Sequence, residues 1–225
     1  MNSSQRRWES RHRESASHPP PEPAAFLVES FPLLPTPHPR SRALDLACGA
    51  GQNAVWLAER GWPVLAVDFA PAAIDRAAAL SAFRGLRVHR RPLPVEAAFK
   101  SSASPRPGRE GRHFLPSLPN RFSGILLAEA DLETSALPVA AFDLILCFQY
   151  LDRAAFTAIE RALAPGGFLL YETFTEDQLS HNDGPRSPDH LLRRNELRSA
   201  FPNLQTLFYR ECTTPRAQAS LLARK

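Results

Sequence analysis

Hydrophobic residues in this chain gather in short continuous runs, which are separated by stretches of mixed apolar and polar residues. A continuous run suits a strand that is covered on both faces of a parallel sheet, whereas the mixed stretches have helical spacing. Five runs predict parallel strands at 44–47, 62–69, 124–131, 143–150 and 168–173. Alternation around Pro215 adds a terminal antiparallel pair at 204–212 and 217–224. The pattern predicts an α/β fold with a doubly wound, seven-stranded, mostly parallel sheet.

Between these runs the pattern predicts helices that cover the sheet, at 52–60, 71–83, 153–164 and 190–201. Gly61 ends the first helix, Pro71 suits the first turn of the second, and Asp189 is a suitable N-cap for the last. Two shorter helices are predicted at 5–14 and 24–31, with a proline-rich break between them. We therefore expect an N-terminal helical cap and linker at 1–41 and a main domain at 42–225.

Residues 84–122 interrupt this alternation with six prolines and with nine arginines and lysines against two glutamates. Such a composition predicts a flexible insertion before the third strand. Residues 86–89 are themselves apolar enough for a strand, and we prefer 124–131 as the third one. The basic charge would attract phosphates, but arginines scattered through a proline-rich loop argue against nucleic-acid binding.

A glycine turn follows the first strand, because residues 45–51 read Asp-Leu-Ala-Cys-Gly-Ala-Gly. Strand, turn and helix in this order bring a ligand against backbone N–H groups, and Gly49 and Gly51 leave room for it. Asp68 lies 17 residues after Gly51, at the tip of the second strand, where a carboxylate can accept two hydrogen bonds from a ribose diol. Together with Ala54, the glycines also fit a nicotinamide dinucleotide fingerprint, so the turn alone leaves two classes of enzyme open.

Three further features favour one class. Asp45 lies four residues before Gly49, the fourth strand begins with Phe142-Asp143, and residues 163–167 read Leu-Ala-Pro-Gly-Gly. As a set, over about residues 42–225, these motifs resemble class I S-adenosylmethionine-dependent methyltransferases, which implies their Rossmann-like fold with a C-terminal antiparallel strand pair. Residues 172–192 look more narrowly like small bacterial methyltransferases related to tellurite-resistance proteins.

The resemblance implies S-adenosylmethionine as the cofactor. Gly49 and Gly51 would then let the backbone approach it, Asp45 would orient its amino-acid end, Asp68 would bind its ribose and Asp131 its adenine. The further cofactor contacts expected from the resemblance are Phe69, Leu132 and Cys147. In this family N-terminal helices cap the cofactor site, and Trp8 and Arg11 match a Trp-x-x-Arg pattern associated with the narrower group.

A sulfonium methyl is already activated, so its transfer needs alignment and a dry pocket rather than a protein nucleophile. Acceptor-binding residues are expected beyond the carboxyl ends of the fourth and fifth strands. A carboxylate or imidazole there can act as general base, and an arginine can hold an anionic substrate. The candidates are Glu172, His190 and Tyr150 for catalysis and Gln149, Phe174 and Arg186 for the substrate. We assign no metal.

The fourth strand ends in Cys-Phe-Gln-Tyr rather than the Asn-Pro-Pro-Tyr expected for amino-group methylation of adenine or glutamine, and the chain has no Pro-Cys pair for cytosine-carbon methylation. The expected partner is therefore a small-molecule acceptor with a thiol, hydroxyl or oxyanion. Two alternatives remain. A NAD(P)-dependent oxidoreductase would leave Asp45 and residues 165–167 unexplained, and a non-catalytic S-adenosylmethionine-binding protein would use the basic insertion as an interaction arm.

The compartment is predicted from what the chain lacks. Its three cysteines are far apart in the sequence, which suits reduced thiols. No apolar run has the length of a bilayer span, and the polar N-terminus lacks the core of a secretion signal. We expect a cytoplasmic protein, and the sequence makes no prediction of its oligomeric state.

Overall fold

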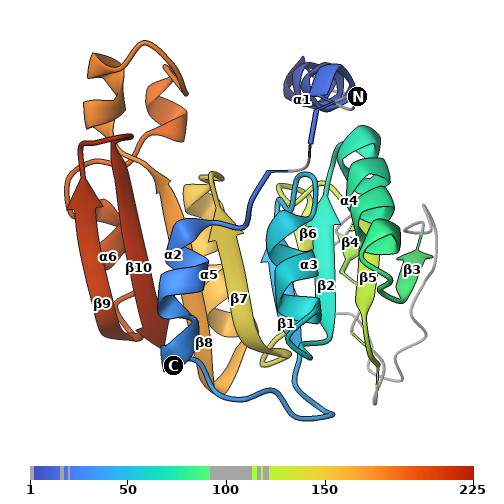
Figure 1. Cartoon of the computed structure of the whole chain (residues 1–225). Coiled ribbons are helices and arrows are strands. Elements are labelled where there is room, and N and C mark those ends of the chain that lie inside the picture. The colour runs from blue at the N-terminus through green and yellow to red at the C-terminus, as the bar shows by residue number, and fades with distance from the viewer. Residues whose placement is uncertain (1–2, 16–17, 20, 92–112, 116–117, 119–121) are drawn as a thin grey trace, which may run out of the picture.

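The structure, a computed structural model, describes residues 3–15, 18–19, 21–91, 113–115, 118 and 122–225. These residues form an eight-stranded sheet with the order β3-β5-β2-β1-β7-β8-β10-β9 (Figure 1). The pairings are parallel from β3 to β8, and β10 is antiparallel to both of its neighbours. The strands are β1 (Ala43–Leu46), β2 (Val64–Asp68), β3 (Val88–Arg91), β5 (Ile125–Glu129), β7 (Phe142–Phe148), β8 (Leu163–Phe174), β9 (Gln205–Cys212) and β10 (Gln218–Arg224).

Helices cover both faces of this sheet, as the doubly wound class requires (Figure 1). One face carries α2 (Ala25–Ser30), α3 (Gln52–Ala58) and α4 (Pro71–Phe83), and the opposite face carries α5 (Phe156–Ala162) and α6 (Glu196–Ser199). A further helix, α1 (Ser3–Glu14), lies over the carboxyl end of β2 and the start of α4. Short 3-10 turns occur at η2 (Phe31–Leu33), η3 (Arg153–Ala155), η4 (Glu176–Ser180) and η5 (Pro188–His190).

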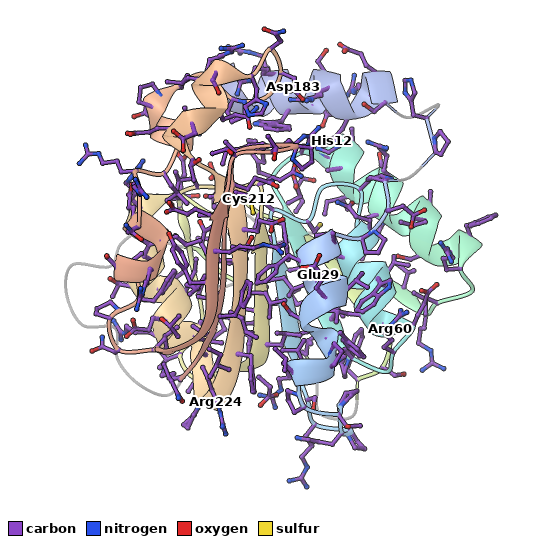
Figure 2. All side chains as sticks on the ribbon, turned by 60° about the vertical axis from the view of Figure 1, so that its left-hand side comes forward. His12, Glu29, Arg60, Asp183, Cys212 and Arg224 are labelled. Atoms are coloured by element: carbon purple, nitrogen blue, oxygen red, sulfur yellow. The ribbon has the colours of Figure 1, made fainter. Side chains whose placement is uncertain are left out.

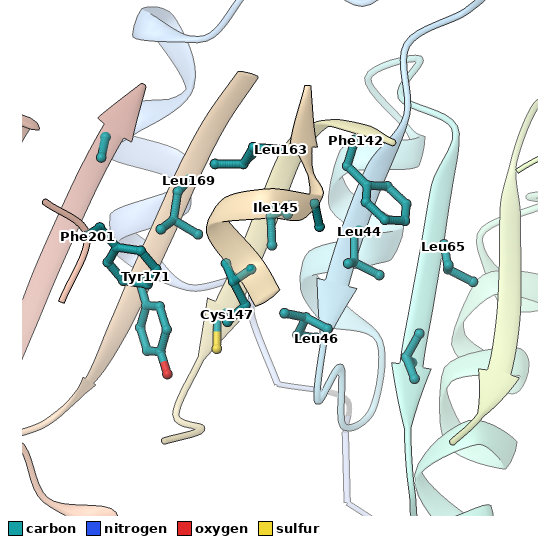
Figure 3. Close-up of a cluster of buried hydrophobic side chains, with 14 of the residues drawn as sticks. Leu44, Leu46, Leu65, Phe142, Ile145, Cys147, Leu163, Leu169, Tyr171 and Phe201 are labelled. Carbon is teal, nitrogen blue, oxygen red and sulfur yellow. The ribbon is translucent and has the colours of Figure 1, made fainter. Parts of the chain in front are cut away.

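Two hydrophobic clusters hold these layers together. One lies between the sheet and the α5 and α6 layer and includes Phe142, Ile145 and Tyr171 (Figure 3). The other lies between the sheet and α2, α3 and α4 and includes Phe26 and Trp62. All residues of β1 and β2 are buried, which explains why their sequences lack polar alternation.

The sheet has one strand more than the seven predicted. Both candidates for the third strand are real strands, because β5 pairs with β2 while β3 pairs with the outer side of β5. The extra strand lies in the segment predicted as an insertion, of which residues 92–112, 116–117 and 119–121 lie outside the described residues. The predicted flexibility of that segment therefore stays a prediction. Its described end forms a small parallel pair, β4 (His113–Phe114) with β6 (Ser135–Ala136).

Two predicted helices have different bounds in the structure. The helix predicted at 153–164 ends at Ala162, because Leu163 already pairs with Phe142 at the start of β8. The helix predicted at 190–201 is wrong over most of its length. The Leu192 N–H donates to the Phe174 carbonyl at 2.9 Å and Asn195 has a φ of +60°, so the helical segment is only α6. Its N-cap is Asn195 rather than Asp189.

The helix predicted at 52–60 is confirmed as α3, which ends two residues earlier, and the helix predicted at 71–83 is confirmed as α4, with its expected proline in the first turn. The terminal antiparallel pair is confirmed as β9 and β10. No helix among the described residues has the length and apolar character needed to cross a membrane.

Candidate cofactor and acceptor site

The glycine turn after β1 has the strained geometry of a ligand cradle. Ala47, Gly49 and Gly51 have φ values of +53°, +55° and +80°. The turn is closed by the Gly51 N–H, which donates to the Cys48 carbonyl at 2.9 Å. The left-handed conformation is unfavourable for Ala47, which has a Cβ, and such strain is commonly stored at functional sites. Ala47 is a member of this turn that the motif did not single out.

Asp68 lies beside this turn, as expected from its position at the tip of β2. Its Oδ2 atom accepts a hydrogen bond from the Gly49 N–H and its Oδ1 atom accepts one from the Ala70 N–H, both at 2.9 Å. The side chain is 4% exposed, and burial raises the pKa of its carboxyl against the opposing effect of these N–H groups and of His12. Each oxygen retains a lone pair with which it can accept a hydroxyl hydrogen.

Asp45 is the more deeply buried carboxyl of the turn, with 1% exposure. The Ala54 N–H bonds to it, and burial raises its pKa to about 8. Its Oδ2 atom has no hydrogen-bond partner among the described residues. A buried oxygen without a partner lowers the stability of the folded protein unless a ligand binds to it.

Helix α1 contributes two residues that the sequence did not point to. The Oε2 atom of Glu9 accepts a hydrogen bond from the Ala72 N–H at 2.9 Å, at the start of α4, and Glu9 is 7% exposed. His12 extends from α1 toward the glycine turn, where its Cε1 atom lies 3.6 Å from the position that a Cβ on Gly49 would take (Figure 2). Burial lowers the pKa of His12, and the charge of Asp68 opposes that shift.

Trp8 and Arg11, which match the family pattern, instead contact each other, since the Arg11 guanidinium lies 5.2 Å from the Trp8 ring centroid. Glu9 and His12 were missed because their partners are far away in the sequence. Glu9 and Ala72 are 63 residues apart, and no local spacing signals such a contact.

These residues fit S-adenosylmethionine. Its ribose diol needs paired acceptors, which Asp68 provides, and the ammonium of its zwitterionic amino-acid end needs a hydrogen-bond acceptor, which the unpartnered Oδ2 of Asp45 provides. Gly49 adopts a positive φ, which favours glycine, and because glycine has no Cβ no side chain of residue 49 occupies the same space. The individual contacts to the cofactor remain predictions.

The expected adenine side lies at the carboxyl ends of β2 and β5. Asp131 accepts a hydrogen bond from the Glu133 N–H at 3.0 Å. Leu132, the next residue in the chain, and Phe69, which follows Asp68, are both half-buried. Glu129, which pairs with Asp68 across the two strands, is an acid that the motifs did not reveal.

The Cys147 side chain points to the opposite side of the sheet from Asp45. It is buried in the cluster under α5, 3.8 Å from the Tyr150 carbonyl, and burial raises its pKa to about 12 (Figure 3). Only the backbone of Cys147 can therefore face a ligand at the sheet edge.

Beyond β7 the chain turns sharply at Gln149, whose φ is +56°. The Gln149 N–H donates to the Glu172 carbonyl at 2.8 Å, so this turn is fastened to β8. Tyr150 follows, with its carbonyl accepting a hydrogen bond from the Tyr171 hydroxyl at 2.9 Å. Burial, together with the nearby Asp152 charge, raises the pKa of the Tyr150 phenol, which keeps it protonated at neutral pH.

Glu172 and Phe174 are among the last residues of β8, and their side chains point toward the face that carries α2. Glu172 is half-buried, and its Oε2 atom accepts a hydrogen bond from the Ser220 hydroxyl at 2.5 Å. Burial raises the pKa of the Glu172 carboxyl. Phe174 is buried two residues further along the same strand.

Arg186 and His190 belong to the loop after β8 and are separate from this pair. Arg186 donates hydrogen bonds to the carbonyls of Leu179 and His181, so its guanidinium fastens its own loop. His190 is exposed on η5. The structure thus groups Glu172, Phe174, Gln149 and Tyr150 at the ends of β7 and β8, and it leaves Arg186 and His190 in the covering loop.

A family model described as a methyltransferase domain matches residues 17–213. The chain belongs to this methyltransferase family. Membership confirms the predicted class I methyltransferase fold, with S-adenosylmethionine as the cofactor of the fold. The glycine turn was the main evidence for the alternative of a nicotinamide-dependent enzyme. Membership in the methyltransferase family also explains this turn, so that alternative loses its support.

An uncharacterized protein of Schizosaccharomyces pombe, UNK4.09, is 28% identical over 184 residues, which is 78% of this chain and 53% of that protein. The chain thus spans about half the length of this curated relative.

Solved structures include an S-adenosylmethionine-dependent methyltransferase from Mesorhizobium loti, with a TM-score of 0.58 and 19% identity over 90% of this chain and 98% of that one. TehB from Haemophilus influenzae has a TM-score of 0.58 and 16% identity over 89% of this chain and 61% of that one.

Proposed function

We propose that this protein methylates a small-molecule acceptor through a thiol, hydroxyl or oxyanion group, with Glu172 as the general base where the acceptor carries a proton. When bound, S-adenosylmethionine supplies a methyl group on a positively charged sulfur, which keeps the carbon–sulfur electron pair. The protein therefore needs to hold the acceptor in line, exclude water and take up a proton.

One observation carries this proposal. At the carboxyl edge of the sheet, two strands away from the glycine turn, Glu172 presents a half-buried carboxyl with a raised pKa. A carboxyl whose pKa moves toward neutrality is a stronger base than an ordinary surface carboxylate. The other candidates are less suited: the Tyr150 phenol stays protonated at neutral pH, and His190 is exposed in the covering loop.

The surroundings of Glu172 support an acceptor with an apolar body. Phe148 pairs with Glu172 across β7 and β8, and Phe174 lies on the same face one pleat further. Both rings are largely buried, so they would contact the carbon skeleton while Glu172 contacts the group that is methylated. Gln149 follows Phe148 at the end of β7 and would help to position the acceptor, whereas the Tyr150 ring packs against the cluster on the opposite face of the sheet.

The first experiment is a calorimetric titration of the protein with S-adenosylhomocysteine and, separately, with NADPH. We expect micromolar binding of S-adenosylhomocysteine and no binding of NADPH. Binding of NADPH alone would reject the methyltransferase proposal.

A panel of aliphatic thiols, phenols and oxyanions is then tested for S-adenosylhomocysteine formation, with Glu172→Gln beside the unchanged protein. We expect turnover of at least one acceptor, reduced by roughly 100-fold or more in the variant. Cofactor binding without turnover on the whole panel would favour the non-catalytic alternative. Equal turnover by Glu172→Gln would remove Glu172 from the mechanism.

A further inference from the structure

A row of side chains crosses four strands beside Glu172. Phe148 pairs with Glu172, Glu172 pairs with Ser220, and Ser220 pairs with Arg210. Residues paired in register on neighbouring strands point to the same face. The row therefore runs along the α2 face from β7 to β9, and its polar members meet only because of the order of these strands.

Ser220 fixes the orientation of the carboxyl. It is 2% exposed, and its hydroxyl donates to the Oε2 atom of Glu172 at 2.5 Å. Oε1 accepts no hydrogen bond from a described residue and is open to solvent. One oxygen is held and the other is available to a ligand.

Arg210 brings a positive charge to this row without forming an ion pair with Glu172. Its guanidinium carbon lies 5.6 Å from the Phe26 ring centroid and 5.7 Å from that of Phe208, and its Nη2 atom lies 3.0 Å from Oε2 of Glu29. These contacts hold the guanidinium on the α2 side, where Figure 2 labels Glu29. A direct pair with Glu172 would keep that carboxylate ionised and weaken it as a base.

We propose that Ser220 and Arg210, with Glu29 restraining Arg210, are positioning residues that present the Oε1 atom of Glu172 to the methyl acceptor. This inference rests on the proposed function. The acceptor's S–H or O–H proton moves to Oε1 as a lone pair of the acceptor's sulfur or oxygen forms the bond to the methyl carbon. The bond between that carbon and the sulfonium sulfur breaks at the same time, and its electron pair stays on the sulfur. The proton then leaves to solvent when the product does, and Glu172 is again ionised.

The charge balance around Glu172 has a defined set of contributors. Burial raises its pKa, the Ser220 hydrogen bond and the Arg210 charge lower it, and the Glu29 charge raises it. They come from β10, β9 and α2, and the neighbouring residue on β7, Phe148, is uncharged. Since the contributions differ in sign, single substitutions should move the titration of Glu172 in opposite directions.

The test is a carbon-13 NMR titration of the full chain with labelled glutamate carboxyls, in which the Glu172 signal is identified by its loss in Glu172→Gln. We expect Ser220→Ala and Arg210→Met to raise the pKa of Glu172, each by roughly 0.5 or more, and Glu29→Gln to lower it. Arg210→Lys, which retains the charge, should stay near the unchanged protein.

Arg224→Met is the matched control, because Arg224 also packs over a phenylalanine, 5.5 Å from the Phe168 ring centroid, but at the other end of β10. It should leave the titration unchanged. Thermal unfolding and S-adenosylhomocysteine binding confirm that each variant is folded. With an acceptor found, the acidic limb of the kcat profile should shift in the same direction as the NMR titration.

The outcomes separate this inference from the proposed function. If neither Ser220→Ala nor Arg210→Met moves the titration of Glu172, the positioning role is rejected, whether or not the protein is a methyltransferase. If the titration moves but turnover does not depend on Glu172, the positioned carboxyl is not the base and the inference is again rejected. If the variants shift both the titration of Glu172 and the pH profile of kcat in the same direction, the result supports the positioning role and the proposed function.

Discussion

In the half of the sheet edge formed by β1, β2 and β5, buried carboxyls accept hydrogen bonds from backbone N–H groups. In the half formed by β7, β8, β10 and β9, the half-buried carboxyl of Glu172 accepts its hydrogen bond from another side chain. Asp68 and Glu9 bind the N–H groups of Gly49, Ala70 and Ala72. Glu172 is held instead by the Ser220 hydroxyl.

The difference matters for how each half can vary. A backbone-bonded carboxyl depends on turn geometry. We therefore expect the half formed by β1, β2 and β5, here called the cofactor half, to tolerate few changes in its glycines and acids. A network of side chains can be altered one residue at a time while the strands remain in place. This arrangement supports the proposal that a common cofactor binds in the cofactor half and a particular acceptor in the other half, here called the acceptor half.

The largest expected effect is in the cofactor half. Asp68→Ala removes the acceptor for the ribose diol, and we expect S-adenosylhomocysteine to bind at least about 50-fold more weakly, as measured by calorimetry. Asp75→Ala is the control, because Asp75 is an exposed aspartate that pairs with Arg90 on the surface. Equal affinity of both variants would mean that the backbone-bonded carboxyl has no role in cofactor binding.

Gly51 tests how strictly the turn is built. A Cβ at Gly51 would lie 2.7 Å from the Cβ of Ala77, and its φ is +80°. Gly51→Ala should lower the free energy of unfolding by about 2–4 kcal/mol in urea titrations, because strain adds to a clash with α4. Gly85→Ala also has a positive φ, but nothing lies within 4 Å, so about 1 kcal/mol is expected. Similar losses would show that strain alone is responsible.

Glu9 tests whether α1 is held by the same kind of bond. Glu9→Ala removes the acceptor of the Ala72 N–H, and we expect α1 docking to weaken by about 1–2 kcal/mol. Trypsin should then cleave at Arg11 and Arg13 several-fold faster. Glu14→Ala provides the comparison, since Glu14 is exposed and accepts a hydrogen bond only from Ser10 among the bonds described. Unchanged cleavage in Glu9→Ala would contradict the attachment of α1 through this carboxyl.

The smallest effect is expected in the loop that covers the acceptor half. The Nε atom of Arg153 lies 2.5 Å from Oε1 of Glu196, and its Nη2 atom donates to the Leu191 carbonyl at 2.8 Å. Arg153→Met should cost only about 0.5–1 kcal/mol, since the pair is partly exposed. Hydrogen exchange should accelerate at residues 188–196, and it should not do so in Arg84→Met, which breaks a similar surface pair with Glu59. A large loss in the free energy of unfolding would contradict this prediction, because it would show that the ion pair stabilises the whole fold and not only the loop.

Much of the fold and of the cofactor half was predictable from local patterns. The unbroken apolar runs of β1 and β2 require cover on both faces, and the glycines between β1 and α3 predict the turn. The eighth strand was considered only as an alternative to the third, because no local pattern shows that both can join the sheet; β3 does so only by pairing with β5. The helix predicted at 190–201 was wrong because the Leu192 N–H bonds to the end of β8 and Asn195 adopts a left-handed conformation.

Local sequence patterns are enough to predict the cradle of strand, glycine turn, helix and acidic strand tip, because each part depends on neighbouring residues and on backbone geometry. The contact of Glu9 with α4, the approach of His12 to Asp68 and the row of Glu172, Ser220 and Arg210 arise only when the whole chain is folded. Glu172 and Ser220 are 48 residues apart, and their contact depends on β10 entering the sheet between β8 and β9. Strand order and register arise from the packing of the whole chain, which no local pattern encodes.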